Sequence, residues 1–145
     1  MKYLLDTHII IWWLEDSPRL TAHERMVIAD GSNEVFVSAA SAWEIEIKRA
    51  KGLLSIPDDW KTHLEGTGFT WLDVTPWHTE HIRTLPEIHK DPFDRMLVAQ
   101  AKSENLTVIS HDGKRKRNWR ICNSLFGDCE RLMSGREGTR HRGGT

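Results

Sequence analysis

A chain of 145 residues with 39% hydrophobic residues is long enough to bury the core of one domain and has the composition of a globular protein. No apolar run approaches the length of a membrane span, and the N-terminus lacks the basic segment and apolar core of a signal peptide, so we expect a cytoplasmic protein without membrane association. Two cysteines late in the chain are too few for a disulfide framework or a zinc knuckle.

The formal net charge of −1 hides an uneven distribution. Residues 1–112 carry 11 Lys and Arg against 18 Asp and Glu, or −7, whereas residues 113–145 carry nine against three, or +6. A basic segment after an acidic body indicates contact either with a polyanion or with the acidic body itself, and a solvated tail is an equally simple alternative. We expect one domain over residues 1–125 and an atypical basic, partly disordered tail over residues 126–145.

Strand and helix signals alternate from the start of the chain. The apolar run at residues 3–5 is too short for a helix and predicts a buried strand, and a buried amphipathic helix is expected at residues 9–14. Asp6 ends this strand, so its carboxylate lies either at the rim where parallel sheets bind ligands or at the N-cap of the helix. The next elements are expected at residues 21–30 (helix), 34–38 (strand), 42–50 (helix), 57–65 (helix), 69–74 (edge strand) and 76–85 (helix).

Asp91 and Pro92 begin the most informative helix, because Asp favours the N-cap and Pro the first helical position. Within this helix Asp94 heads an apolar face that continues at steps of three and four residues through Ala101. The Asp94 carboxylate is therefore expected to point inward at the helix N-terminus. A buried carboxylate is costly unless it is paired or bound to a metal, although the helix dipole offsets part of the cost.

Residues 106–110 predict another buried strand, and Asp112 follows it much as Asp6 follows the first. Beyond this point the signals weaken, and residues 119–125 are compatible with either a strand or a helix. Because strands and helices alternate, we expect an α/β fold in three layers, α/β/α, with helices on both faces of a central, mostly parallel sheet.

In such a fold four acids can converge on one rim. Two of them, Asp6 and Asp112, project from strand ends. Asp94 comes from a helix start, with Asp91 beside it, and Glu44 lies one turn into the helix after the second strand. An oxygen-rich site without cysteine suits Mg²⁺ or Mn²⁺, which can activate a water and stabilise the leaving oxygen in phosphodiester hydrolysis. Spacing alone does not separate a phosphatase from a nuclease.

Three blocks of sequence resemble the PIN-domain family, and more narrowly the VapC-type toxins of bacterial toxin–antitoxin pairs: LLDTH and WWL within residues 4–14, VSAASAWEI at residues 37–45 and HKDPFDRMLVAQA at residues 89–101. The resemblance covers roughly residues 1–112. It implies a compact PIN-like α/β/α fold, Mg²⁺- or Mn²⁺-dependent endoribonuclease activity, a cognate VapB-like antitoxin and a homodimer. The acidic positions of the family fall on Asp6, Glu44, Asp94 and Asp112, with Asp91 as an accessory or capping acid.

Several residues near these motifs have two interpretations each. Thr7 either contacts metal-bound water or a phosphate, or caps the first helix, and Arg95 either pairs with Asp91 or contacts RNA. Glu44 could instead pair with Lys48 on an exposed helix face. Three tryptophans in apolar stretches are expected mainly in core or dimer packing, with base stacking as the less favoured role: Trp12, Trp13 and Trp43.

Four consecutive basic residues are predicted to hold the RNA backbone beside the acidic rim: Lys114, Arg115, Lys116 and Arg117. Two other classes of function stay open. One is another acid-rich hydrolase, such as a phosphatase or a DNA nuclease, although a phosphatase with an aspartyl nucleophile would need a second Asp where His8 stands. The other is a non-catalytic RNA- or protein-binding module that keeps the PIN fold, although the loss of an acid would signal it and all of them are present.

Overall fold

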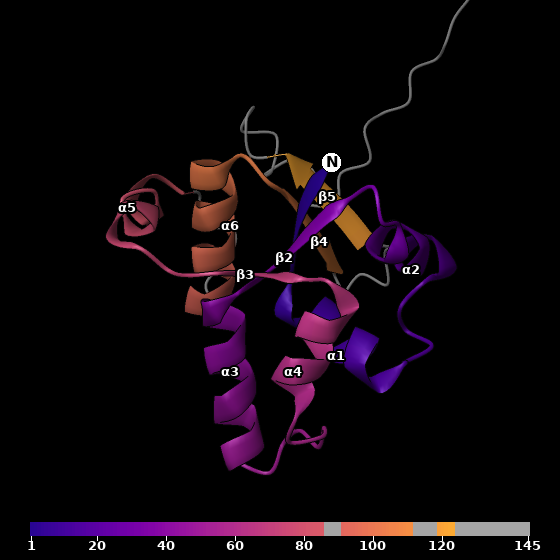
Figure 1. Cartoon of the computed structure of the whole chain (residues 1–145). Coiled ribbons are helices and arrows are strands. Elements are labelled where there is room, and N and C mark those ends of the chain that lie inside the picture. The colour runs from indigo at the N-terminus through magenta and orange to yellow at the C-terminus, as the bar shows by residue number, and fades with distance from the viewer. Residues whose placement is uncertain (86–90, 112–118, 124–145) are drawn as a thin grey trace, which may run out of the picture.

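The structure, a computed structural model, describes residues 1–85, 91–111 and 119–123, with His111 and residues 119–123 as backbone only (Figure 1). The predicted tail at residues 126–145, together with Asp112 and the basic run at residues 114–117, lies outside the described residues. The elements in chain order are β1 (Lys2–Leu5), α1 (Thr7–Glu15), α2 (Ala22–Ala29), β2 (Glu34–Ser38), α3 (Ala39–Ala50), α4 (Trp60–Thr67), β3 (Thr70–Leu72), α5 (Pro76–Thr79), the 3₁₀ helix η1 (Ile82–Thr84), α6 (Pro92–Glu104), β4 (Thr107–His111) and β5 (Trp119–Asn123).

The five strands form one sheet in the order β3-β2-β1-β4-β5. Strands β3, β2, β1 and β4 run parallel to one another, and β5 runs antiparallel to β4 at the edge. The predicted mostly parallel sheet is therefore confirmed, and residues 119–123 form a strand and not a helix. The chain leaves β1 toward β2 on one side and returns to β4 on the other, so the strand order reverses between β1 and β4. Ligands of open α/β sheets bind outside the carboxyl ends of the strands at such a point.

Helices cover both faces of the sheet because successive strand residues point to opposite faces. In β1, Tyr3 and Leu5 enter a core that α1, α2 and α4 complete, whereas Leu4 enters a second core on the side of α6. Strand β4 alternates in the same way, with Ile109 in the first core and Val108 in the second. The result is the predicted three-layer α/β/α arrangement (Figure 1).

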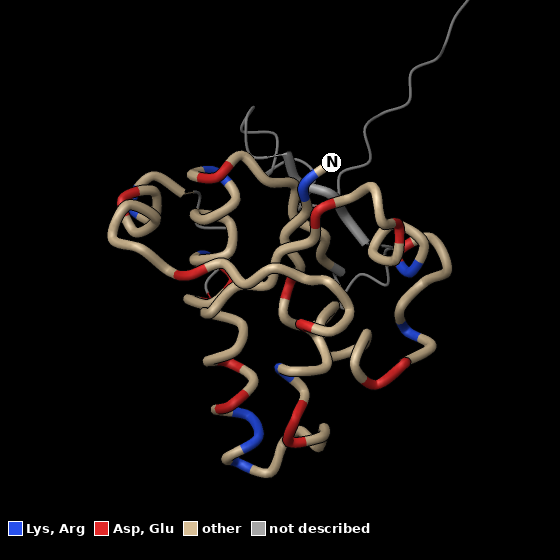
Figure 2. The backbone as a smooth tube through the Cα atoms, viewed as in Figure 1, with Lys and Arg blue, Asp and Glu red and all other residues tan. Residues whose placement is uncertain are grey.

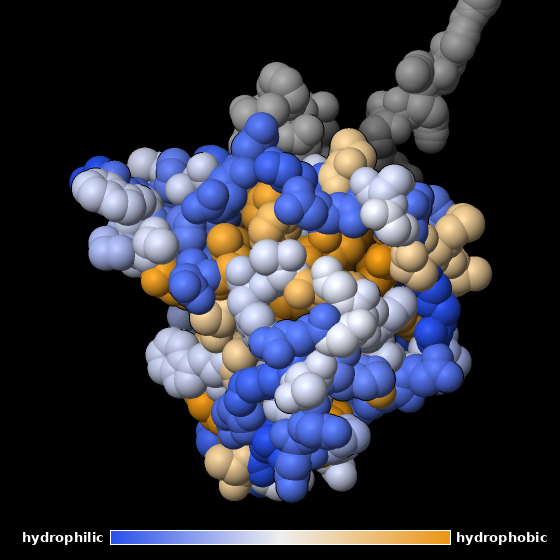
Figure 3. All heavy atoms as spheres, in the orientation of Figure 1, coloured by the Kyte–Doolittle hydropathy of each residue, from blue (hydrophilic) through white to orange (hydrophobic). Residues whose placement is uncertain are grey.

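The outer surface of α3 and α4 is mostly hydrophilic, and the hydrophobic side chains visible from this side gather over the strands (Figure 3). In the described part of the chain, no helix combines the length and the apolar character that a membrane crossing requires.

Capping side chains begin the two helices that matter most for the site. The Ser38 hydroxyl accepts a hydrogen bond from the Ala40 N–H (2.9 Å) at the start of α3. The Asp91 carboxylate accepts one from the Phe93 N–H (2.8 Å) at the start of α6, as predicted for an Asp-Pro pair. Both helices therefore begin at the carboxyl edge of the parallel strands, next to each other (Figure 1).

Residues 76–85 do not form the single helix that the sequence predicts. Helix α5 ends at Thr79, whose hydroxyl donates to the Pro76 carbonyl (2.6 Å), and the chain continues through three-residue turns into η1. Threonine hydroxyls compete in this way with the backbone donors of a helix, and the tighter 3₁₀ turn is a common result near helix ends.

Candidate active site

Asp6 lies at the point where the strand order reverses. Its backbone N–H donates to the Ile109 carbonyl (3.0 Å), which extends the pairing of β1 and β4 by one residue beyond Leu5. Asp6 is the N-cap of α1 by backbone position, but its side chain makes no capping hydrogen bond. Helix capping therefore does not explain why a carboxylate stands at this position. The residue is only 7% exposed.

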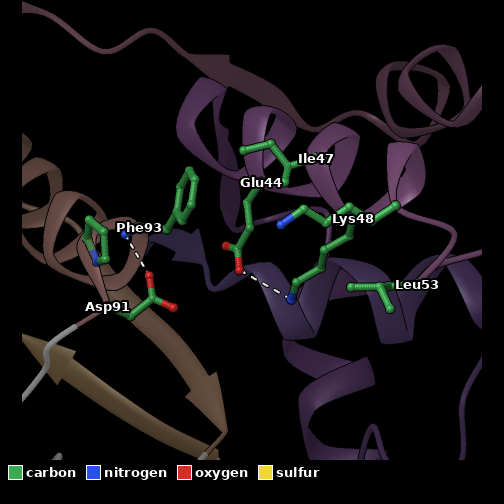
Figure 4. A pocket seen from close by; sticks show the side chains of 8 residues that line it. Glu44, Ile47, Lys48, Leu53, Asp91 and Phe93 are labelled. Atoms are coloured by element: carbon green, nitrogen blue, oxygen red, sulfur yellow. Dashed lines mark hydrogen bonds and ion pairs between the residues drawn. The ribbon is translucent and has the colours of Figure 1, made fainter.

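Glu44 reaches the same edge of the sheet from α3. Its Oε2 pairs with the Lys48 ammonium at 3.3 Å, as the spacing of four residues predicts, but Glu44 is buried rather than on an exposed face (Figure 4). Its second oxygen, Oε1, is buried and has no hydrogen-bond partner among the described residues. A buried carboxylate oxygen without a partner is costly, which makes it a candidate ligand for a cation.

The start of α6 contributes two more acids. Asp94 is half-buried one turn into the helix, in agreement with the predicted inward face, whereas Asp91 is exposed and uses one oxygen for the cap. Helix α6 contacts α3 at this end, where the Phe93 and Trp43 rings lie 5.1 Å apart. We call the set of Asp6, Glu44, Asp91 and Asp94 the acidic rim.

Two carboxylates of the acidic rim, Asp6 and Asp94, have a raised pKa. Burial, and then the charges of Asp94, Glu44 and Asp91, raise the pKa of Asp6 to about 8, against the smaller opposing effect of the nearby Thr7 N–H. Burial, and then the charges of Asp91 and Glu44, raise the pKa of Asp94 to about 6, while the Lys48 ammonium opposes this rise. The four acids therefore lie within one another's electrostatic field, as the sequence predicted for Asp6, Glu44 and Asp94.

The chemistry of the acidic rim fits a hard divalent cation such as Mg²⁺ or Mn²⁺, which prefers oxygen ligands. A cation would relieve the mutual repulsion and give the Glu44 Oε1 atom a partner. Within residues 1–85 and 91–111, however, no three acids, histidines or cysteines are close enough to form a complete ligand set. Asp112, the predicted fourth ligand, lies outside the described residues.

Two residues with predicted RNA contacts have structural roles here. Thr7 is buried and its hydroxyl donates to the Ser41 hydroxyl (2.9 Å), which joins the first turn of α1 to α3. Arg95 donates from Nη2 to the Ile82 carbonyl (2.9 Å), which holds η1 against α6. Their contacts with RNA stay predictions.

The three tryptophans of the apolar stretches differ in burial. Trp12 is buried and Trp13 is packed against the first core, as expected. Trp43 is 65% exposed, so it does not pack in the core of this chain, and the other expected role, packing in a dimer, stays a prediction. It lies on the outer side of α3, directly before the buried Glu44, because successive helix residues face different directions.

The sequence did not predict a buried polar network that joins the start of α3, α5 and α6. The Ser38 hydroxyl donates to Gln100 Oε1 (2.5 Å), which links the cap of α3 to the middle of α6. His78 Nδ1 accepts the Thr75 N–H (3.0 Å), so its proton lies on Nε2 and is donated to Glu104 (2.7 Å). The sequence signal for this network was Gln100, which stands inside the apolar run of α6, because a buried side-chain amide needs hydrogen-bond partners.

The fold and the rim together define a class of protein, an α/β/α domain with carboxylates clustered where the order of its parallel strands reverses. The model of the PIN domain family matches residues 3–118, which is most of the chain, so this chain belongs to the PIN domain family.

Among solved structures, the fold is similar to a chain in the crystal structure of VapBC2 from Rickettsia felis bound to a DNA fragment from their promoter. The TM-score is 0.61 and the sequence identity 18%, over 82% of this chain and 99% of that chain. At this level of identity the likeness concerns the fold. The comparison with curated proteins yields no match.

Proposed function

We propose that this protein is a VapC-type endoribonuclease toxin that uses Mg²⁺ or Mn²⁺ to cleave phosphodiester bonds of RNA in the cytoplasm. The observation that carries the proposal is the burial of Asp6 and Glu44 in the field of Asp94 at the carboxyl edge of a PIN-family sheet. Carboxylates in this position destabilise the cation-free fold, so a structural role alone does not account for them.

In the proposed site Asp6, Glu44 and Asp94 hold the cation together with Asp112, and Asp91 acts as an accessory ligand through the oxygen that its cap leaves available. The cation would activate a water and stabilise the leaving oxygen of the cleaved bond. The chain's own contribution is to hold the carboxylates at fixed positions, through the Thr7–Ser41 contact and the start of α6. Because Asp6 keeps a proton near neutral pH in the cation-free protein, binding of the cation would release it.

The proposed partners follow from the same charges. A VapB-like antitoxin would cover the acidic rim and insert a basic side chain among the carboxylates, where charge-assisted hydrogen bonds replace the cation. The likeness to a chain of a VapBC complex supports a partner of this kind. The basic run Lys114, Arg115, Lys116 and Arg117 would hold the RNA backbone. A homodimer is proposed on a different basis, the resemblance to VapC-type toxins.

The test is incubation of the full-length protein with single-stranded RNA, duplex DNA and a phosphomonoester, each with EDTA, Mg²⁺ or Mn²⁺. We expect cleavage of RNA only, dependent on the cation and absent in Asp94→Asn. Equal cleavage in EDTA would exclude the metal mechanism, preference for DNA or the phosphomonoester would favour the alternative hydrolases, and no reaction in any arm would favour a non-catalytic module.

A further inference from the structure

An open groove of about 530 Å³ begins at the acidic rim and runs along α3 (Figure 4). Asp91 and Phe93 lie at one end, Leu53 lies at the other, and Glu44 and Lys48 lie between them. Helix α3 and its C-cap line the groove with residues that recur at steps of three and four and so form one face: Glu44, Ile47, Lys48 and the C-cap Lys51. From Glu44 to Lys51 this face covers seven residue steps, or about 10 Å of helix axis.

The charge of the groove changes along its length. Acidic positions in the middle of α3 give way to basic ones at its C-terminal end (Figure 2). Lys48 is partly neutralised by Glu44 at 3.3 Å, whereas Lys51 is exposed and makes no ion pair with another described residue. A polyanion that enters the acidic end with a cation would thus meet a positive charge two turns further along.

An aromatic pair borders the groove on the side of the rim. Phe93 lines the groove, and its ring meets the Trp43 ring edge-on, with 5.1 Å between centroids and 74° between planes. Phe93 is in turn fixed by the Asp91 cap at its backbone N–H. Most of the Trp43 indole is open to solvent, so the pair presents a supported aromatic surface next to the carboxylates.

We propose that this groove binds the single-stranded RNA nucleotides next to the cleaved phosphate, with one base stacked on Trp43 and the backbone held at Lys51. The inference rests on the proposed function and specifies how its substrate is held. Stacking requires an unpaired base, so the surface selects single-stranded over double-stranded RNA, and it tolerates different bases because each has a π-face. A protein segment would use the apolar side chains of the groove but would not need Lys51.

The experiment measures binding of a labelled single-stranded oligoribonucleotide to the full-length Asp94→Asn protein, which the proposed function makes inactive in cleavage. Trp43→Leu in this background is expected to weaken binding roughly 5- to 100-fold, the range of base–aromatic stacking, and Trp43→Phe should keep most of the affinity. Trp77→Leu is the matched control, because Trp77 is 69% exposed and is not part of the groove, and it should bind as the parent does. Lys51→Ser should lower the slope of log affinity against log salt by about 0.7.

Each outcome supports or overturns the proposal. Unchanged RNA binding in Trp43→Leu, with a melting temperature that shows a folded protein, overturns it. If Trp43→Leu instead weakens binding of the antitoxin or shifts the protein from dimer to monomer, the groove is a protein interface and the proposal is wrong. A wild type that cleaves RNA while Trp43→Leu cleaves and binds equally well refutes this inference alone. A wild type that neither binds nor cleaves RNA refutes the proposed function as well.

Discussion

Replacing Asp6 by Asn should stabilise the cation-free protein, and the gain should grow with pH. The pKa of Asp6 rises from 3.8 to about 8 in the folded protein, about four units worth about 1.4 kcal/mol each, so the penalty for its charge is on the order of 5 kcal/mol at high pH. A raised pKa means that the folded state binds the proton more tightly. The associated stability is therefore present below pH 4 and is lost as the pH rises toward 8.

The assay is thermal unfolding of wild type and Asp6→Asn between pH 4 and pH 9, with EDTA or with Mn²⁺. In EDTA we expect the two proteins to melt alike near pH 4 and the variant to melt roughly 10–20 °C higher near pH 8.5, since one kcal/mol corresponds to about 2–4 °C for a chain of this length. At a hundredfold excess over its dissociation constant, Mn²⁺ should return about 2.7 kcal/mol to the wild type and much less to the variant.

Asp30→Asn is a control of opposite sign. Asp30 is exposed, and hydrogen bonds from the Ser32 N–H and hydroxyl lower its pKa. Its charge is favoured in the folded state, so its removal should lower stability slightly at neutral pH and leave the response to Mn²⁺ intact. An Asp6→Asn variant that melts below the wild type at pH 8.5, together with a wild type that ignores Mn²⁺, would refute the cation site.

Three further predictions concern activity and stability. Asp94→Asn should reduce RNA cleavage roughly 100-fold or more with an unchanged circular dichroism spectrum, because it removes a ligand charge from the rim; full activity would contradict its role. Changing Lys114, Arg115, Lys116 and Arg117 to Ser should weaken RNA binding and lower the salt slope by about 3, and unchanged binding would leave these residues as a solvated segment. Gln100→Leu should cost about 1–3 kcal/mol in urea unfolding, since it removes the acceptor of the Ser38 hydroxyl and the amide donor to the Asp73 carbonyl, whereas Ser103→Ala on the exposed side of α6 should cost little.

Elements with a strong local signal could be predicted from the sequence. The apolar run of β1 and the Asp-Pro start of α6 place Asp6 and Asp94 at one edge of the sheet, because each depends on residues only a few positions away. The prediction of one helix over residues 76–85 was wrong because the Thr79 hydroxyl donates a hydrogen bond to the Pro76 carbonyl and so competes with the backbone donors of a helix. Composition does not reveal this competition.

Features that depend on distant residues could not be predicted. Glu44 has the local pattern of an exposed helix pair with Lys48, and its burial follows from the packing of α3 against α6, about fifty residues further along the chain. The partner of Gln100 is 62 residues away, so no window of sequence contains both. The exposed Trp43 stands in an apolar stretch and would be assigned to a core on composition alone.

The departures from local expectation lie close together in the structure. Three such residues lie where α1, α3 and α6 begin. Asp6 stands at an N-cap but its side chain makes no capping hydrogen bond, Glu44 is buried with one oxygen that has no partner among the described residues, and Trp43 is exposed to solvent. Each is unfavourable for the isolated fold, and the two apolar cores and the Gln100 network supply the stability that keeps them in place. Unfavourable groups that gather at one edge of a sheet are best explained by what binds there. In the proposed function a divalent cation would satisfy the carboxylates and an unpaired base would cover the indole, and an RNA substrate bound with its cation would meet both needs at one site.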